Sequence, residues 1–139
     1  MSGRPYLIDK SALARISRPA VAGAVDSLFD RGLLATCGMI DLEVLYSAKS
    51  PTDYERLRTD QAVLQQLTID QAMFDRALDV QRQLAGTSRH RAASIPDLLI
   101  AACAEARGAT VLHYDADYDL IAEITGQRTQ WVVPLGSVP

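Results

Sequence analysis

The sequence is poor in cysteine and has no long apolar run, and each absence excludes a class of protein. Its two cysteines, Cys37 and Cys103, lie in apolar segments outside any CxxC pattern, which favours reduced core thiols over a disulfide framework or a zinc site. No apolar run reaches the roughly 18 residues of a membrane span. The N-terminal residues lack the apolar segment of a secretory signal peptide, so we expect a cytoplasmic protein.

Lysine is scarce as well. Lys10 and Lys49 are the only lysines among 14 basic residues, and the others are arginines. Arginine suits bidentate contacts to phosphate, but a GC-rich genome would produce the same bias. The formal net charge of −3 argues against a broadly basic surface.

What is present is a chain of one-domain size in which apolar strands alternate with amphipathic helices. With 139 residues, 48% of them hydrophobic, we expect a single domain over 1–139. The pattern predicts strands at 5–9, 33–37, 67–69, 109–114 and 130–133, and helices at 11–16, 20–31, 40–48, 52–67, 71–85, 94–107 and 117–125. Capping-box spacing occurs at Thr52 and Glu55 and again at Ser94 and Asp97. Alternation of this kind indicates an α/β fold, a three-layer α/β/α sandwich with a central, mainly parallel sheet.

Four acids fall where such a sheet binds its ligands. Asp9 ends the first predicted strand, and Asp115 follows the strand at 109–114. Glu43 lies early in the helix after the second strand, and Asp97 lies in the first turn of the helix at 94–107. Ligands of an open parallel sheet bind outside the carboxyl ends of its strands, so we expect these acids to meet at one edge.

Clustered carboxylates repel one another unless a cation lies among them. Two lysines cannot supply that charge, whereas Mg²⁺ or Mn²⁺ prefers oxygen ligands of this kind. Simpler roles remain open for each acid: Asp9 and Asp97 are also suited to helix capping, and Glu43 to a solvated helix face. Asp41 is expected to face solvent. Asp117 and Asp119 also fit ordinary first-turn positions.

Several segments, taken in order, resemble the PIN domain, and most of all the VapC toxins of prokaryotic toxin–antitoxin pairs. They are "YLIDKSAL" at 6–13, "IDLEVLYSA" at 40–48, "IPDLLIAACAEARGATVLHYDADYDLIAE" at 95–123 and the closing "WVVP". The resemblance implies a PIN-like fold and matches the family's acids to Asp9, Glu43, Asp97, Asp115 and Asp117. Tyr118 stands where the family often has Phe, a change from which we expect little chemical effect. The segment 50–93 matches no family pattern.

The same resemblance implies a metal-dependent endoribonuclease. Asp9, Glu43, Asp97 and Asp115 would hold one or two Mg²⁺ ions, for which Mn²⁺ can substitute. Asp117 would act through water or at a second ion. Ser11 would hydrogen-bond a ligand carboxylate or a substrate phosphate. A metal-activated water would then hydrolyse the RNA backbone and leave a 5′ phosphate.

The partners implied are RNA, a VapB-like antitoxin and a second copy of the chain. Arg15, Arg89 and Arg91 are candidate phosphate contacts, although Arg89 and Arg91 also fit a solvated basic loop. We expect His113 to be a packed core histidine, and a general-acid role for His90 is a weaker hypothesis. The antitoxin's C-terminal tail would cover the acidic site and meet the helices near 11–31 and 40–66.

Three competing functions can be weighed on the sequence. An aspartyl phosphatase would need an Asp at the position of Ser11 and a downstream lysine. A phospho-receiver domain would need paired acids after its first strand and a lysine after its last strand. A catalytically silent PIN-like module that binds RNA or protein would usually have lost one or more of the acids, and this chain keeps the full set.

Overall fold

A five-stranded sheet, parallel throughout, forms the centre of the computed structural model, which describes residues 3–139. Its strand order is β3-β2-β1-β4-β5. The strands are β1 (Tyr6–Ile8), β2 (Leu34–Thr36), β3 (Gln65–Gln66), β4 (Thr110–His113) and β5 (Thr129–Trp131). Both β2 and β4 flank β1, so the ends of these three strands lie side by side.

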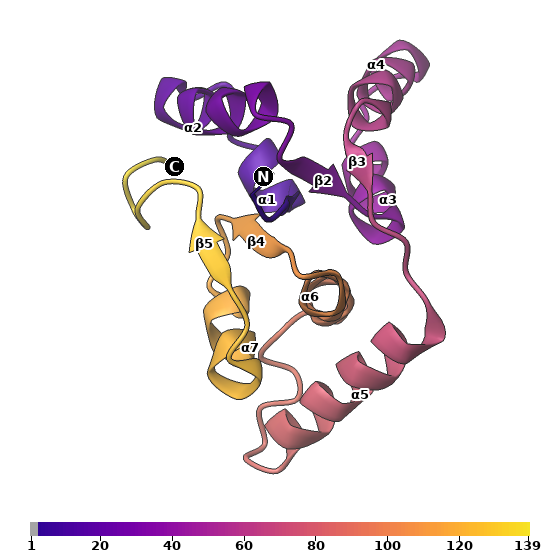
Figure 1. Ribbon diagram of the computed structural model, residues 1–139, viewed down its shortest axis with the longest axis vertical. Helices are drawn as coiled ribbons and strands as arrows, with labels where there is room; N and C mark the ends of the chain where they lie inside the picture. The colour runs from indigo at the N-terminus through magenta and orange to yellow at the C-terminus, as the bar shows by residue number, and fades with distance from the viewer. Residues whose placement is uncertain (1–2) are drawn as a thin grey trace.

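Helices cover both faces of the sheet (Figure 1). They are α1 (Lys10–Leu13), α2 (Pro19–Asp30), α3 (Gly38–Tyr46), α4 (Pro51–Ala62), α5 (Gln71–Ala85), α6 (Ile95–Arg107) and α7 (Asp117–Thr125). Successive strand residues point to opposite faces. Accordingly Leu7 belongs to the core beneath α3, α5, α6 and α7, whereas Ile8 belongs to a second core beneath α1 and α2. The predicted three-layer α/β/α sandwich is confirmed.

The middle of the chain departs from the predicted boundaries. The third strand is Gln65–Gln66 and not 67–69. The Leu67 N–H makes the last hydrogen bond to β2, at the Thr36 carbonyl, and the Leu67 side chain is buried in the core. The preceding helix therefore ends at Ala62 rather than continuing to residue 67. Its cap is Ser50, whose side chain accepts from the Asp53 N–H at 3.0 Å, so the predicted capping box at Thr52 and Glu55 is wrong.

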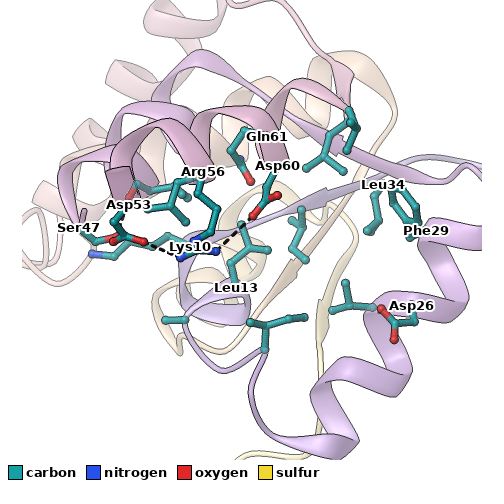
Figure 2. A pocket seen from close by; sticks show the side chains of 18 of the residues that line it. Lys10, Leu13, Asp26, Phe29, Leu34, Ser47, Asp53, Arg56, Asp60 and Gln61 are labelled. Carbon is teal, nitrogen blue, oxygen red and sulfur yellow. Dashed lines mark hydrogen bonds and ion pairs between the residues drawn. The ribbon is translucent and has the colours of Figure 1, made fainter. Parts of the chain in front are cut away.

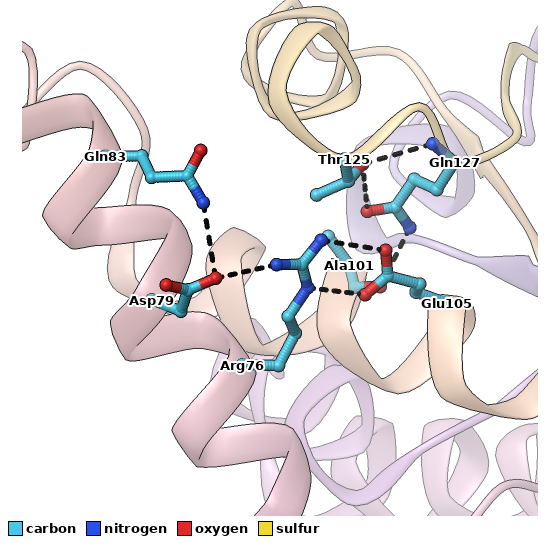
Figure 3. Close-up of polar contacts among 7 residues, drawn as sticks. All are labelled: Arg76, Asp79, Gln83, Ala101, Glu105, Thr125 and Gln127. Atoms are coloured by element: carbon cyan, nitrogen blue, oxygen red, sulfur yellow. Dashed lines mark hydrogen bonds and ion pairs between the residues drawn. The ribbon is translucent and has the colours of Figure 1, made fainter.

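A polar cluster ties α5, α6 and the segment after α7 together (Figure 3). Arg76 on α5 donates to both carboxylate oxygens of Glu105 on α6, at 2.8 and 3.2 Å, and to Asp79 at 2.7 Å. The Gln127 side chain donates to the Ala101 carbonyl at 2.8 Å. These bonds hold α6, which carries Asp97 in its first turn.

Cys37 and Cys103 are buried free cysteines in the larger core, as predicted. No helix within residues 3–139 combines the length and apolar character that crossing a membrane requires.

Candidate metal centre

The five predicted acids come together at the carboxyl edge of the sheet, in two overlapping groups. Asp9, Glu43 and Asp97 each offer one carboxylate oxygen, and these oxygens all lie within 4.8 Å of one another. Asp97, Asp115 and Asp117 form a second group within the same limit. Asp97 belongs to both groups and is the centre of the cluster.

A series of three hydrogen bonds fixes the backbone around Asp97. Ser94 caps α6, its side chain accepting from the Asp97 N–H at 3.3 Å, so the capping role falls to Ser94 and the Asp97 carboxylate is left for the cluster. The Ser94 N–H donates to Asp117 Oδ2 at 3.0 Å, and the Asp117 N–H donates to Asp115 Oδ1 at 2.9 Å. The start of α6 is thereby bound to the start of α7.

Asp9 combines a capping role with membership of the cluster. Its Oδ2 accepts from the Ser11 N–H at 3.0 Å and from the Ser11 hydroxyl at 2.6 Å. The Ser11 hydroxyl in turn accepts from the Tyr114 N–H at 2.8 Å, just beyond the end of β4. Ser11 therefore contacts a carboxylate of the cluster directly.

The electrostatics of the site call for a cation. Burial, followed by the charge of Asp9, raises the pKa of Asp97 to about 9. Burial and the charge of Asp9 also raise the pKa of Glu43, which is half-buried. Asp97 Oδ2 is buried without a hydrogen-bond partner among the described residues, so without a cation the buried group keeps its proton at neutral pH. Oxygen donors gathered around an unpartnered carboxylate oxygen fit a hard divalent ion.

Tyr118 is a site residue whose importance the sequence interpretation missed. Its side chain is fully buried, and its hydroxyl lies 2.7 Å from Asp9 Oδ1 and 3.1 Å from Asp97 Oδ1. The expectation that Tyr here differs little from Phe is wrong, because the hydroxyl is the part of the side chain that meets the acids. Sequence spacing could not show this contact, since Asp9 is 109 residues away.

Asp41 is not the solvent-facing acid that was predicted. Its Oδ1 accepts from the Thr36 hydroxyl at 2.7 Å and from the Gln61 side chain at 3.0 Å. Thr36 is fully buried and Gln61 is 7% exposed, so this carboxylate joins the end of β2 to α3 and α4. It fixes the start of the helix that carries Glu43.

His113 is a packed core histidine, as predicted. Its Nδ1 accepts from the Asp115 N–H at 3.1 Å, and its ring centroid lies 5.0 Å from that of Tyr118. Burial lowers the pKa of His113, which keeps the ring neutral. Asp119 is exposed and accepts from the Trp131 indole at 3.1 Å, away from the other acids.

The candidate phosphate-binding arginines differ in their surroundings. The Arg15 guanidinium donates to the carbonyls of Ser11 and Pro139, at 2.7 and 2.9 Å, and lies over the Tyr114 ring. Arg89 donates to the Thr87 hydroxyl at 3.0 Å. Arg91 and His90 are exposed in the loop that leads into α6 and therefore approaches the acids.

A groove runs between α1 and α2 on one side and α3 and α4 on the other (Figure 2). Its volume is about 520 Å³, and its apolar lining includes Leu13, Phe29 and Leu57. Arg56 also lines the groove and pairs with Asp53 at 2.6 Å and with Asp60 at 3.5 Å. Lys10 also lines the groove and directly follows Asp9 in the chain, so the groove reaches toward the acidic cluster.

A parallel sheet with acids at its carboxyl edge is the arrangement expected of a PIN domain, and comparison with known families gives the same result. The model of the PIN domain matches residues 6–124, and the chain therefore belongs to the PIN domain family. Among curated relatives, Ribonuclease VapC51 of Mycobacterium tuberculosis is 47% identical over 133 residues, covering 96% of both chains. Ribonuclease VapC21 of the same species is 44% identical and covers 95% of this chain and 96% of its own.

Solved structures share the fold at much lower identity. VapBC2 from Rickettsia felis, bound to a DNA fragment from its promoter, superposes with a TM-score of 0.74 at 16% identity, covering 91% of this chain and 98% of that one. DNA-bound VapBC from Salmonella typhimurium gives a TM-score of 0.74 at 16% identity, covering 94% and 100%. These similarities establish the fold.

Proposed function

We propose that this protein is a metal-dependent endoribonuclease and the toxin of a VapBC-type toxin–antitoxin pair, with one PIN domain over 1–139. The observation that carries the proposal is the buried Asp97 Oδ2, which has no hydrogen-bond partner among residues 3–139 and lies where the two groups of acids meet. Relatives named as ribonucleases, at 47% and 44% identity over nearly their full length, support the same reaction. The compartment that fits an RNA substrate is the cytoplasm.

Asp9, Glu43, Asp97 and Asp115 would hold one or two Mg²⁺ ions, with Asp117 as a further or water-mediated ligand. When bound, the metal would lower the pKa of a coordinated water and stabilise charge on the attacked phosphate. Mn²⁺ can substitute, because it accepts the same oxygen ligands.

The chain's own residues position these groups. Ser11 holds one oxygen of Asp9, Ser94 holds the Asp97 backbone, and the Asp115 carboxylate orients the start of α7. No side chain is required as a covalent nucleophile. The products would carry a 5′ phosphate and a 3′ hydroxyl.

RNA would be held by arginines beside the acidic cluster. Arg89 and Arg91 lie in the loop before α6, where phosphates of a strand entering the site would pass. Arg15 would join them by exchanging its carbonyl contacts for phosphate oxygens.

The partner would be a VapB-like antitoxin seated in the groove between α1–α2 and α3–α4. An amphipathic helix laid in an apolar groove is a common mode of peptide recognition. The groove lies between the two stretches of chain, 11–31 and 40–66, that were expected to meet the antitoxin. A tail continuing past Lys10 would reach the acids. Homodimerisation is proposed as well, and the exposed Leu42 and Tyr46 on α3 offer an apolar surface for it.

The test is cleavage of total RNA by purified, antitoxin-free protein. Reactions would contain Mg²⁺, Mn²⁺ or EDTA, with Asp97→Asn protein prepared in parallel. We expect discrete fragments with 5′ phosphates that require the metal and disappear in the variant. Absence of cleavage by folded, metal-binding protein would favour the silent binding module, and cleavage that survives Asp97→Asn would contradict the assigned site.

A further inference from the structure

We propose that Tyr118 is a positioning residue of the metal centre, whose hydroxyl fixes the Asp9 and Asp97 carboxylates so that Asp97 Oδ2 is presented to the ion. The inference deepens the proposed function and rests on its metal site. It concerns binding of the ion, so it can be tested without RNA.

The hydroxyl reaches two acids that come from different parts of the sheet edge. It lies 2.7 Å from Oδ1 of Asp9, at the end of β1, and 3.1 Å from Oδ1 of Asp97, in the first turn of α6. Tyr118 itself belongs to α7. One hydroxyl therefore joins three elements at the point where their carboxylates converge.

The contacts of the two carboxylates divide their oxygens into different roles. Asp9 Oδ2 is engaged by Ser11, and Asp9 Oδ1 is engaged by Tyr118. Asp97 Oδ1 is engaged by Tyr118, and Asp97 Oδ2 has no partner among residues 3–139. A carboxylate anchored through one oxygen has its other oxygen held in a fixed direction. Groups that hydrogen-bond a metal's ligands orient them in this way, and their loss typically weakens metal affinity by about 10–100-fold.

The ring of Tyr118 is itself fixed by packing, so its hydroxyl is held in one position relative to the two carboxylates. Its side chain is fully buried, and its ring lies at a 39° tilt against His113, with 5.0 Å between centroids. Asp115 holds the turn that precedes α7 by accepting from the Asp117 N–H. Phenylalanine would keep the same packing and remove only the contact with the acids.

The experiment compares Tyr118→Phe with Tyr114→Phe by calorimetric titration with Mn²⁺ in the absence of RNA. The Tyr114 hydroxyl also makes two hydrogen bonds, donating to the Val138 carbonyl at 2.7 Å and accepting from the Gly136 N–H at 2.7 Å, and both partners are backbone groups rather than acids of the cluster. We expect Tyr118→Phe to weaken Mn²⁺ binding by about tenfold or more. Tyr114→Phe should stay within about twofold of the natural protein. Equal Mn²⁺ affinity in Tyr118→Phe and the natural protein would overturn the proposal.

Thermal unfolding of both metal-free variants separates positioning from general stability, because a purely structural role would lower the melting temperature and leave Mn²⁺ affinity unchanged. If Tyr118→Phe does not fold, the natural protein with ¹³C-labelled tyrosine still decides. Its Tyr118 Cζ resonance should shift on addition of Mg²⁺, and an unmoved resonance at saturating Mg²⁺ would refute the contact.

The ribonuclease proposal fails separately. If the folded natural protein cleaves no RNA but Tyr118→Phe still weakens Mn²⁺ binding, the ribonuclease proposal is wrong and the positioning role of Tyr118 stands. Unchanged Mn²⁺ affinity in Asp97→Asn would refute the site, and the positioning role with it.

Discussion

Replacing Asp97 by Asn should stabilise the metal-free protein while abolishing its response to metal. Asp97 is 5% exposed and adjoins several other acids, and its pKa is raised to about 9. In the metal-free folded state it therefore retains a proton that it releases on unfolding at neutral pH. Asn carries no such proton, is similar in shape to the protonated acid and can donate to the neighbouring carboxylates.

The size of the effect follows from the pKa. Asp97 has an ordinary pKa of 3.8, and pH 7 lies about three units above that value. Each unit corresponds to about 1.4 kcal/mol, so keeping the proton at pH 7 costs about 4 kcal/mol as an upper limit. Because the folded-state pKa is raised, the natural protein is not penalised below the unfolded-state pKa of 3.8, and it loses stability as the pH rises from there toward about 9. The gain from Asp97→Asn should therefore be smaller at pH 5, by about 3 kcal/mol.

The assay is urea and thermal unfolding in EDTA at pH 5 and pH 7, with Asp119→Asn as the matched control. Asp119 is an exposed acid of the same edge that contacts Trp131 and lies outside the cluster. At pH 7, Asp97→Asn should raise the melting temperature by up to about 10 °C, while Asp119→Asn changes it little. Mg²⁺ at about 100 times its dissociation constant should stabilise the natural protein by about 2.7 kcal/mol and Asp97→Asn not at all. A gain that is absent at pH 7, or equal at both pH values, would show that Asp97 does not keep its proton in the metal-free folded state.

Four further outcomes are expected. Mn²⁺ binding at pH 7.5 should release about one proton, because Asp97 keeps its proton up to about pH 9; calorimetry in buffers of different ionisation enthalpy measures it. Gln61→Ala should cost about 1–3 kcal/mol in urea unfolding, because it removes a buried donor to the Asp41 carboxylate. Phe29→Glu places a charge in the apolar groove and should weaken binding of the purified antitoxin by about tenfold or more, with unfolding unchanged because Phe29 is 48% exposed. Arg91→Ala should reduce the salt dependence of RNA binding by about one unit of slope, measured by fluorescence anisotropy.

Much of the candidate metal site could be predicted because it follows from topology. Asp9 and Asp115 come directly after apolar runs, and Asp97 follows a serine and a proline that mark a helix start. Parallel strands end at the same edge, so residues separated by a hundred positions were predicted to meet without any knowledge of side-chain contacts. The predicted three-layer fold, on which this expectation depends, is the fold observed.

The parts that the sequence did not predict depend on contacts between distant side chains. Nothing near Asp41 indicates that Gln61 will reach it, and nothing near Tyr118 indicates that its hydroxyl will meet Asp9. The strand Gln65–Gln66 has two exposed side chains and joins the sheet only through its backbone, so hydrophobic pattern pointed instead to the apolar residues that follow it. Hydrophobic periodicity predicts which residues are buried, but it does not predict which exposed residues pair through their backbone at the edge of a sheet.

The proposed function requires a divalent ion between the two groups of acids, with Asp97 as their shared ligand. The most direct measurement is the anomalous difference density of crystals grown with Mn²⁺. We expect a peak within about 2–2.5 Å of Asp97 Oδ2 that also contacts oxygens of Asp9 and Glu43, of Asp115 and Asp117, or of both groups through two ions. A fully occupied Mn²⁺ elsewhere, or no peak beside Asp97 at saturating Mn²⁺, would contradict it.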